Sequence, residues 1–171
     1  MKKLLLIMPL VFLFGCGDDS NVTADGSKTT EQSSNWEYSQ ETDEMDDHTN
    51  YYATATSKNT ASIRIADMEE HMTITVRNRG EENDVLLAFD ELIGFVSDLT
   101  ASVRVRFDDE KAETYECSLP ADYSPTTIFI DEADKFIANL KKAKKVKIEA
   151  TLIDNGTQVL EFDVDGFKWE H

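Results

Sequence analysis

The sequence predicts a mostly β protein, a single antiparallel β-sandwich that carries one short helix. Three observations support this fold class. Apolar residues alternate with polar ones in several segments, turn-forming residues separate these segments, and only one segment has helical spacing. Alternating strands have one buried and one solvated face, which is typical of antiparallel sheets. Because neither a βαβ rhythm nor an internal repeat accompanies them, we expect one sandwich domain over residues 35–171.

Four segments between residues 71 and 167 alternate with a period of two, so every second side chain should face the core. The expected core residues are Met72, Ile74 and Val76; Val103, Val105 and Phe107; Val146, Ile148, Ala150 and Leu152; and Leu160, Phe162 and Val164. Residues 84–96 are more continuously apolar, and we expect two central strands there, joined near Asp90 and Glu91. Residues 51–59 predict an exposed strand that offers Tyr contacts, or an edge strand.

Turn-forming residues lie between these segments. They are Arg79-Gly80-Glu81, Asp108-Asp109-Glu110 and Asp154-Asn155-Gly156. The last group separates two alternating segments and is therefore a good hairpin signal.

The segment with helical spacing lies at about residues 131–143. Its apolar residues recur at helical intervals, and they are Ala133, Phe136, Ile137 and Leu140. Acidic residues precede it and a run of lysines over 141–147 follows, an arrangement that complements the helix macrodipole. We expect the helix to cap one end of the sheet, and its position accounts for most of the basic run.

Residues 1–15 have the composition of a secretory signal. Lys2 and Lys3 precede an apolar run that is much shorter than the roughly 20 residues needed to span a bilayer. Residues 13–16, Leu-Phe-Gly-Cys, resemble the bacterial lipobox. The resemblance implies that the Cys16 thiol receives a diacylglycerol and that cleavage follows Gly15. The alternative is an ordinary signal peptide with an unrelated cysteine.

Residues 16–34 are predicted to form the lipidated cysteine and a flexible linker, because they are too poor in large apolar side chains to form a core. Acyl chains anchor a protein to a membrane without spanning it. We therefore expect a cell-envelope location. Gly17 follows the cysteine, whereas inner-membrane retention in enteric bacteria usually uses Asp there, so the outer membrane is slightly favoured if the envelope has one.

Composition excludes several function classes. The chain has 17 Lys and Arg against 34 Asp and Glu, a net charge of −17, and such a surface repels nucleic acid.

With Cys16 lipidated, Cys117 remains alone, and its alternating context predicts a buried thiol. The three histidines, His48, His71 and His171, have no metal-site or catalytic spacing. We expect no catalytic residue, no cofactor and no enzyme activity.

One acidic segment offers weak calcium candidates. Asp43, Glu44, Asp46 and Asp47 supply oxygen ligands, but they lack the spacing of a calcium loop. A solvated acidic loop is the expected interpretation.

The order of several segments is familiar. They read NWEYSQETDEM, YYATATSKN, MTITVRNRGEENDVLLAFD, SVRVRFDDEKAETYECSLPADYSPTTIFI and, after the helix, KKVKIEATLIDNGTQVLEFDVDGFKW. Together they resemble a group of bacterial and prophage-encoded lipoproteins without assigned function. They are also distantly similar to the VasI/TagO accessory proteins of type VI secretion and to the invasion-associated locus B proteins. The resemblance implies a β-sandwich envelope protein and no catalytic residues.

These features predict a membrane-anchored, non-enzymatic lipoprotein that binds an envelope protein or serves as an accessory module. Aromatic side chains are favoured interface anchors, and the candidates are Trp36, Tyr38, Tyr51, Tyr52 and Trp169. The two tryptophans lie near opposite ends of the domain, so we expect the terminal segments to pair or to cap the same core. The alternative function is a periplasmic or surface protein that binds a small ligand, with or without calcium, in a concave polar pocket.

Overall fold

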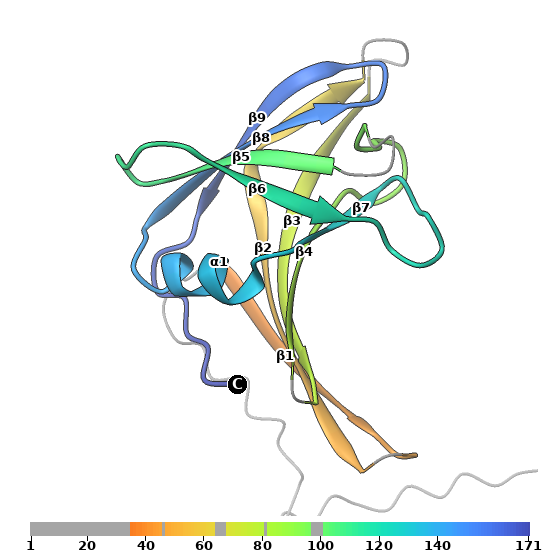
Figure 1. Cartoon of the computed structure of the whole chain (residues 1–171), viewed down its shortest axis with the longest axis vertical. Coiled ribbons are helices and arrows are strands. Elements are labelled where there is room, and N and C mark those ends of the chain that lie inside the picture. Colours follow the sequence, from red (N-terminus) through yellow and green to blue (C-terminus); the bar gives the residue numbers. More distant parts are fainter. Residues whose placement is uncertain (1–34, 46, 64–67, 81, 97–100) are drawn as a thin grey trace, which may run out of the picture. The chain divides into compact units, whose positions relative to one another are not determined.

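The computed structural model describes residues 35–45, 47–63, 68–80, 82–96 and 101–171, which form nine strands and one helix (Figure 1). The elements are β1 (Trp36–Asp43), β2 (His48–Ile63), β3 (Met68–Arg79), β4 (Asn83–Ala88), β5 (Ala101–Phe107), β6 (Glu113–Ser118), β7 (Thr127–Ile130), α1 (Ala133–Leu140), β8 (Lys145–Leu152) and β9 (Gly156–Asp163). The predicted signal peptide, Cys16 and the linker to residue 34 lie outside the described residues.

The nine strands form one antiparallel sheet in the order β1-β2-β3-β4-β7-β6-β5-β8-β9. The prediction of a mostly β fold with one short helix is thereby confirmed. The finer prediction of a sandwich of two sheets is not confirmed. The short strand β7 pairs with both β4 and β6, and it joins all the strands into one sheet.

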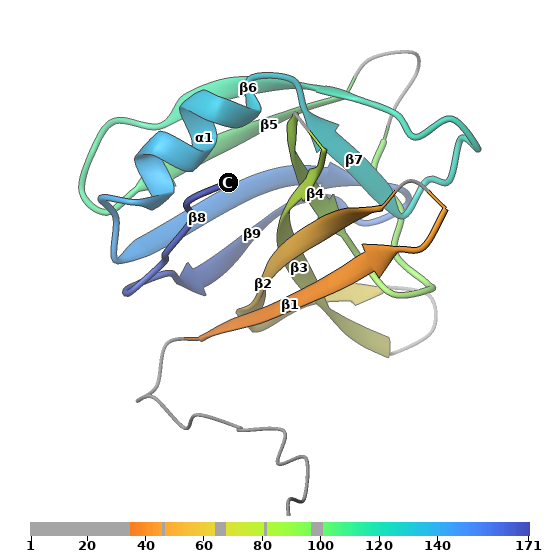
Figure 2. The same cartoon turned by 90° about the horizontal axis from the view of Figure 1, so that it is seen from below.

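The sheet bends so that strands far apart in its order meet (Figure 2). β2 lies against β9, although six strands separate them in the sheet. The Asn59 side chain donates to the Val159 carbonyl at 2.9 Å and accepts from the Glu161 N–H at 2.8 Å. Gln158 exchanges two hydrogen bonds of 3.1 Å with the backbone of Ser62. These amide side chains replace a backbone ladder, and the core lies on the inner face of the bent sheet.

Every residue that the four alternating segments predicted to face the core is buried, and the period-two prediction is confirmed there. Residues 51–59 were expected to be an exposed strand that offers Tyr contacts, or an edge strand. The edge position is wrong, and the strand is half buried rather than exposed, although Tyr51 and Tyr52 remain partly accessible. β2 lies between β1 and β3, and Ala53 and Ala55 are completely buried on its inner face. Alanine contributes little apolar area to the pattern, so this strand looks polar in the sequence.

Residues 84–96 contain one strand of the sheet rather than two. After β4 ends at Ala88, the chain forms an irregular segment with a single bridge between Phe95 and Leu152. The carboxylate of Glu70, on β3, accepts the backbone N–H groups of residues 91, 92 and 93 at 3.3, 3.0 and 3.1 Å. Because a side chain satisfies these donors, they do not join a second strand ladder.

The predicted turns are present in the described residues, and Glu81 of the first turn lies outside them. Gly80 follows β3 with φ of +95°, and Gly156 begins β9 with φ of +69°. Asp108, after β5, also has a positive φ, and its carboxylate accepts the backbone N–H groups of Lys144 and Lys145 at 3.0 and 2.8 Å. A side chain thus ties the β5–β6 turn to the start of β8.

The helix is confirmed, but it is shorter than predicted. It buries Phe136, Ile137 and Leu140, as expected. Asp134 lies in its first turn and Lys141 is its C-cap residue, so the charges flank the helix in the predicted order, although the last turn itself contains no basic residue. Lys145 and Lys147 belong to β8, where Lys147 forms an ion pair with Glu161 of β9. No helix in the described part of the chain is long and apolar enough to cross a membrane.

Candidate functional site

The chain continues after β9 as a C-terminal tail, residues 164–171, that contacts the inner face of β1 and β2 through Trp36, Tyr38 and Tyr51. Strand register places Trp36, Tyr38 and Gln40 of β1 on this face, opposite Ala55, Ala53 and Tyr51 of β2. The tail starts at the core, where Val164 is fully buried. Its further course therefore covers one end of the sheet.

Individual hydrogen bonds hold the tail in place. The Trp36 indole N–H donates to the Val164 carbonyl at 3.1 Å, and the Lys168 backbone N–H donates to the Tyr38 hydroxyl at 2.8 Å. Further along, the Trp169 indole N–H donates to Asn83 Oδ1 at 3.0 Å. Trp36 and Tyr38 on β1 and Asn83 on β4 therefore fix the position of the tail.

Aromatic contacts run along the same tail. Phe167 packs on Trp36 with ring centroids 4.5 Å apart and lies parallel to Trp169 at 6.4 Å. His171 meets the Trp169 ring edge-on at 5.2 Å and stacks on Tyr51 at 3.6 Å, with an angle of 10° between the rings. The expectation that the two terminal segments cap the same core is confirmed, because Phe167 joins the two tryptophans.

A pocket of about 320 Å³ lies between the tail and the β1–β2 ribbon. We call it the aromatic pocket, and its lining residues are Tyr38, Ser39, Gln40, Tyr51, Tyr52, Lys168, Trp169 and His171. Four of the five predicted contact residues therefore line one pocket. Trp36, the fifth, is 5% exposed and lies outside the lining.

The predicted aromatic residues differ in what they expose. Tyr38 is 48% exposed, whereas Trp169 is 5% exposed. Strand alternation turns Tyr38 and Tyr51 to the inner face and Tyr52 to the outer face. Tyr38 is consequently the ring most open to an incoming group, Tyr51 lies beside it with His171 stacked on its ring, and the tryptophans form the support beneath them.

The Tyr38 hydroxyl is a neutral hydrogen-bonding group. Burial raises the pKa of this phenol above its usual value of 10.0, and the hydrogen bond from the Lys168 N–H opposes the shift. Since the oxygen accepts that N–H, its own proton remains available to a ligand acceptor. The pocket therefore offers aromatic faces together with a hydroxyl donor.

The sequence analysis did not identify four of the lining residues as site residues, and these are Ser39, Gln40, Lys168 and His171. A signal existed, because Phe167, Trp169 and His171 continue a period of two beyond β9. Gly166, with φ of +80°, shifts the phase of that period by one residue and hides its continuity with Phe162 and Val164.

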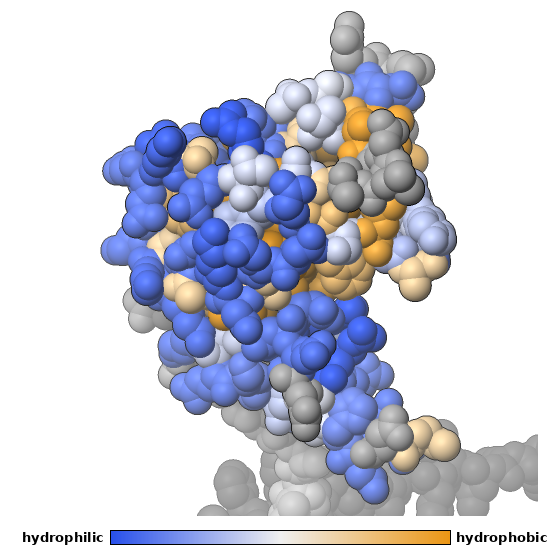
Figure 3. Space-filling view, viewed as in Figure 1, coloured by the Kyte–Doolittle hydropathy of each residue, from blue (hydrophilic) through white to orange (hydrophobic). Residues whose placement is uncertain are grey.

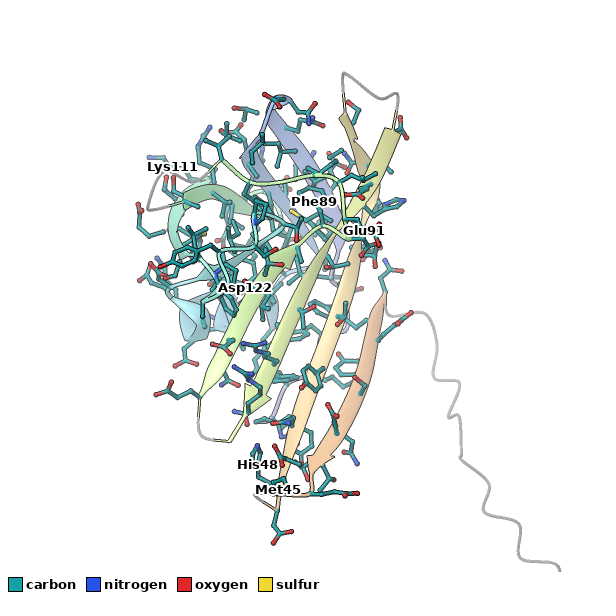
Figure 4. The ribbon with its side chains drawn as sticks, turned by 90° about the vertical axis from the view of Figure 1, so that its right-hand side faces the viewer. Met45, His48, Phe89, Glu91, Lys111 and Asp122 are labelled. Carbon is teal, nitrogen blue, oxygen red and sulfur yellow. The ribbon has the colours of Figure 1, made fainter. Side chains whose placement is uncertain are left out.

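The calcium candidates lie at the β1–β2 turn, where Met45 and His48 are labelled (Figure 4). Asp43 ends β1 and accepts the Met45 N–H at 2.9 Å, Glu44 and Asp47 are exposed, and Asp46 lies outside the described residues. Within the described ranges, no three His, Cys, Asp or Glu residues gather in a way that could hold a metal ion.

Two further features lie outside the aromatic pocket. Cys117 is 3% exposed, as predicted, and burial raises the pKa of its thiol to about 12. Exposed apolar side chains also occur outside the pocket, and Figure 3 shows one apolar area on a mostly hydrophilic face. Leu92, Val96 and Ile153 are among the exposed apolar residues, at 48%, 43% and 43%.

No family model, curated protein or solved structure matches this chain. The resemblance to envelope lipoproteins stays a prediction, and the site itself supplies the argument for a function.

Proposed function

We propose that the chain is a lipid-anchored protein of the bacterial cell envelope that binds another protein through the aromatic pocket, without catalysing a reaction. The observation that carries this proposal is the convergence of Tyr38, Tyr51 and Trp169 on one pocket, whose lining also includes Tyr52. Tyr and Trp dominate the energetics of protein interfaces because each buries a large area at a low cost in side-chain entropy.

The shape of the pocket supports a protein partner. It is lined by strands and the tail, it is held by hydrogen bonds to Trp36, Tyr38 and Asn83, and about 320 Å³ is sufficient for one large side chain. An aromatic recess whose walls are already held by hydrogen bonds accepts an anchor residue at a lower cost in ordering.

The membrane anchor follows from the N-terminal sequence. We propose that Cys16 carries the lipid and that residues 17–34 connect it to the domain. Cys16→Ser should then move the protein from the membrane fraction to the soluble fraction. Retention of the variant in membranes, without labelling of the wild type by a fatty-acid analogue, would contradict the anchor.

A small-ligand function is the second candidate, and the pocket volume favours it. About 320 Å³ lies at the lower end of the roughly 300–1,000 Å³ that small-molecule sites occupy. A sugar ring could stack on Tyr38 or Tyr51 and accept the Tyr38 hydroxyl proton. A thermal-shift screen with glycans, in the presence and absence of calcium, tests this candidate, because a ligand that binds the folded state raises Tm.

Crosslinked affinity purification from native membranes tests the protein-binding proposal. The wild type should recover one dominant envelope protein, and Tyr38→Ala combined with Tyr51→Ala should lose it. Tyr123→Ala is the matched control, because Tyr123 is 78% exposed in a loop that does not line the pocket. Equal recovery by all three proteins, each confirmed as folded, would contradict a role for the pocket.

A further inference from the structure

We propose that β1 is a docking edge on which an extended, basic segment of the partner pairs as an additional strand. In this arrangement an apolar side chain of the incoming strand enters the aromatic pocket. This inference rests on the proposed function, because it names the feature of the partner that the same site recognises.

β1 is the end of the sheet that offers a strand for pairing. It is the first strand in the sheet order, and among the described strands it pairs only with β2. The six residues 37–42 are all exposed, and the strand borders the sheet in Figure 4. Half of the backbone N–H and C=O groups of such a strand point away from the sheet, so they can pair with another chain.

The opposite edge of the sheet is different. β9 exchanges hydrogen bonds with β2 across the bend, because the Asn59 side chain donates to the Val159 carbonyl and accepts from the Glu161 N–H. Gln158 of β9 also binds the backbone of Ser62. This edge is partly occupied by the protein itself, and β1 is therefore the better template for strand addition.

The charge of β1 selects the partner. Glu37 and Glu41 are exposed on its outer face, and neither forms an ion pair with another described residue. Lys or Arg side chains on the same face of an incoming strand would lie beside these carboxylates. Opposite charges directly across a strand pair are favourable, and like charges are unfavourable.

The same charges argue against a second copy of this chain. Two β1 strands paired antiparallel about Ser39 would place Glu37 of each copy opposite Glu41 of the other. The net charge of −17 would add repulsion between the two copies. The occupant that fits is therefore a basic segment of another protein.

The inner face supplies side-chain selectivity. Tyr38 and Gln40 alternate with Glu37 and Glu41, so an incoming strand has one set of side chains toward the pocket and the other toward the acids. Strand addition commonly takes affinity from main-chain hydrogen bonds and specificity from pockets for alternate side chains. The recognised pattern is consequently basic and apolar residues in strict alternation.

Model peptides test the pattern with the full chain purified from its membranes. The probe is a labelled peptide, Lys-Val-Lys-Phe-Lys-Val-Lys, and its binding is followed by fluorescence anisotropy. A peptide of the same composition with the lysines in one block should bind at least about tenfold more weakly, because it cannot present both faces. Hydrogen exchange should slow at the amides of β1 when the alternating peptide is bound.

Two N-methylated versions of the peptide test strand pairing itself. One carries methyl groups on the odd-numbered amides and the other on the even-numbered amides. Only one set of amides can face β1, so one version should lose binding and the other should retain it. If both versions bind like the parent, charge attraction explains the binding and strand pairing is overturned.

Charge reversal on β1 provides the matched variants. Glu37→Lys with Glu41→Lys should weaken binding of the alternating peptide by at least about fivefold, because two favourable pairs become repulsive. Glu110→Lys with Glu116→Lys makes the same change in net charge at two exposed positions of the β5–β6 hairpin and should leave binding unchanged. Equal weakening by both double variants would overturn the role of β1.

The outcomes separate this inference from the proposed function. If the alternating peptide does not bind but the crosslinked purification recovers a Tyr38- and Tyr51-dependent partner, strand docking is overturned and the protein-binding function stands. If both experiments fail, both proposals are overturned. Sedimentation tests the alternative occupant. If the wild type forms reversible dimers and the double variant Glu37→Lys with Glu41→Lys changes their stability, the occupant of β1 is a second copy of this chain and the basic partner is overturned.

Discussion

Two regions of the sheet's inner face are covered by different chemistry. In the first, which we call the helix end, α1 places Phe136 against Phe107 and Tyr115, with ring centroids 5.3 and 5.5 Å apart. In the second, which we call the tail end, the C-terminal tail places alternating aromatic side chains on β1 and β2, and hydrogen bonds fix it. The three rings of the helix end are at most 7% exposed, whereas the tail end leaves Tyr38 half exposed beside a pocket.

The difference indicates a division of roles. Apolar burial is non-directional and roughly proportional to area, so the helix end should supply much of the unfolding free energy. The tail end also buries Trp36, Phe167 and Trp169, but its position over β1 is set by single hydrogen bonds with modest net energies. We therefore expect loss of one of these hydrogen bonds to cost less stability than loss of a buried ring at the helix end.

Truncation at the helix end should have the largest effect on stability. Phe136→Ala removes a completely buried ring and should lower the free energy of unfolding by about 3–5 kcal/mol. Urea unfolding measures the loss. Tyr123→Ala, at an exposed loop position, is the control and should change it by less than about 0.5 kcal/mol.

A change in the middle of the tail should have a smaller effect. Trp169→Phe keeps a ring but removes the indole donor to Asn83, and we expect a loss of about 1–2 kcal/mol. Hydrogen exchange should accelerate in residues 165–171 and not in α1. A loss as large as that of Phe136→Ala would contradict the proposed division between the two ends.

Tyr38→Phe should have a still smaller effect. It retains the ring but removes the hydroxyl that accepts the Lys168 N–H, so we expect a loss of about 0.5–1.5 kcal/mol in urea unfolding. Partner binding that depends on the ring should persist, unlike in Tyr38→Ala. Complete loss of binding in Tyr38→Phe would show that the hydroxyl, rather than the ring, is the essential group.

The two ends can also be compared by alkaline titration. Burial raises the pKa of Tyr38 at the tail end and of Tyr115 at the helix end above 10.0, with opposing hydrogen bonds from Lys168 and Asn139. The folded state thus favours the neutral phenols. Their contribution to stability is complete below the unfolded pKa near 10 and is lost as pH rises through the higher folded pKa.

Ultraviolet difference absorbance of wild type, Tyr38→Phe and Tyr115→Phe measures these ionisations. The titration curve of each variant is subtracted from that of the wild type, and the difference is the ionisation of the removed phenol. This ionisation should occur above the pKa of a free tyrosine. A difference curve with its midpoint at or below pH 10 would contradict the raised pKa of the tyrosine that was replaced.

Much of the fold could be predicted, because local pattern determines it. The alternation of Met72, Ile74 and Val76 predicts their strand, and the helical spacing of Phe136, Ile137 and Leu140 predicts the helix. The sheet order could not be predicted in the same way. It depends on four-residue β7, which pairs with β4 and β6, and on side-chain bonds such as that of Asn59 to Val159.

The candidate site was predictable in residue type but not in place. Their aromatic side chains made Tyr38, Tyr51, Tyr52 and Trp169 candidates. They line one pocket only because the C-terminal tail crosses β1, and the hydrogen bond between Lys168 and Tyr38 joins residues that are 130 positions apart in the sequence. Sequence spacing carries no information on such a contact. The phase change at Gly166 also concealed His171 from the pattern.

Site-specific photo-crosslinking in native membranes tests the central claim most directly. A photoreactive phenylalanine analogue at position 38, beside the aromatic pocket, is compared with the same analogue at position 123. We predict one covalent adduct with an envelope protein from position 38 and none from position 123. An adduct from position 123 alone, with the position 38 protein folded and anchored, would contradict the claim that this pocket is the binding site.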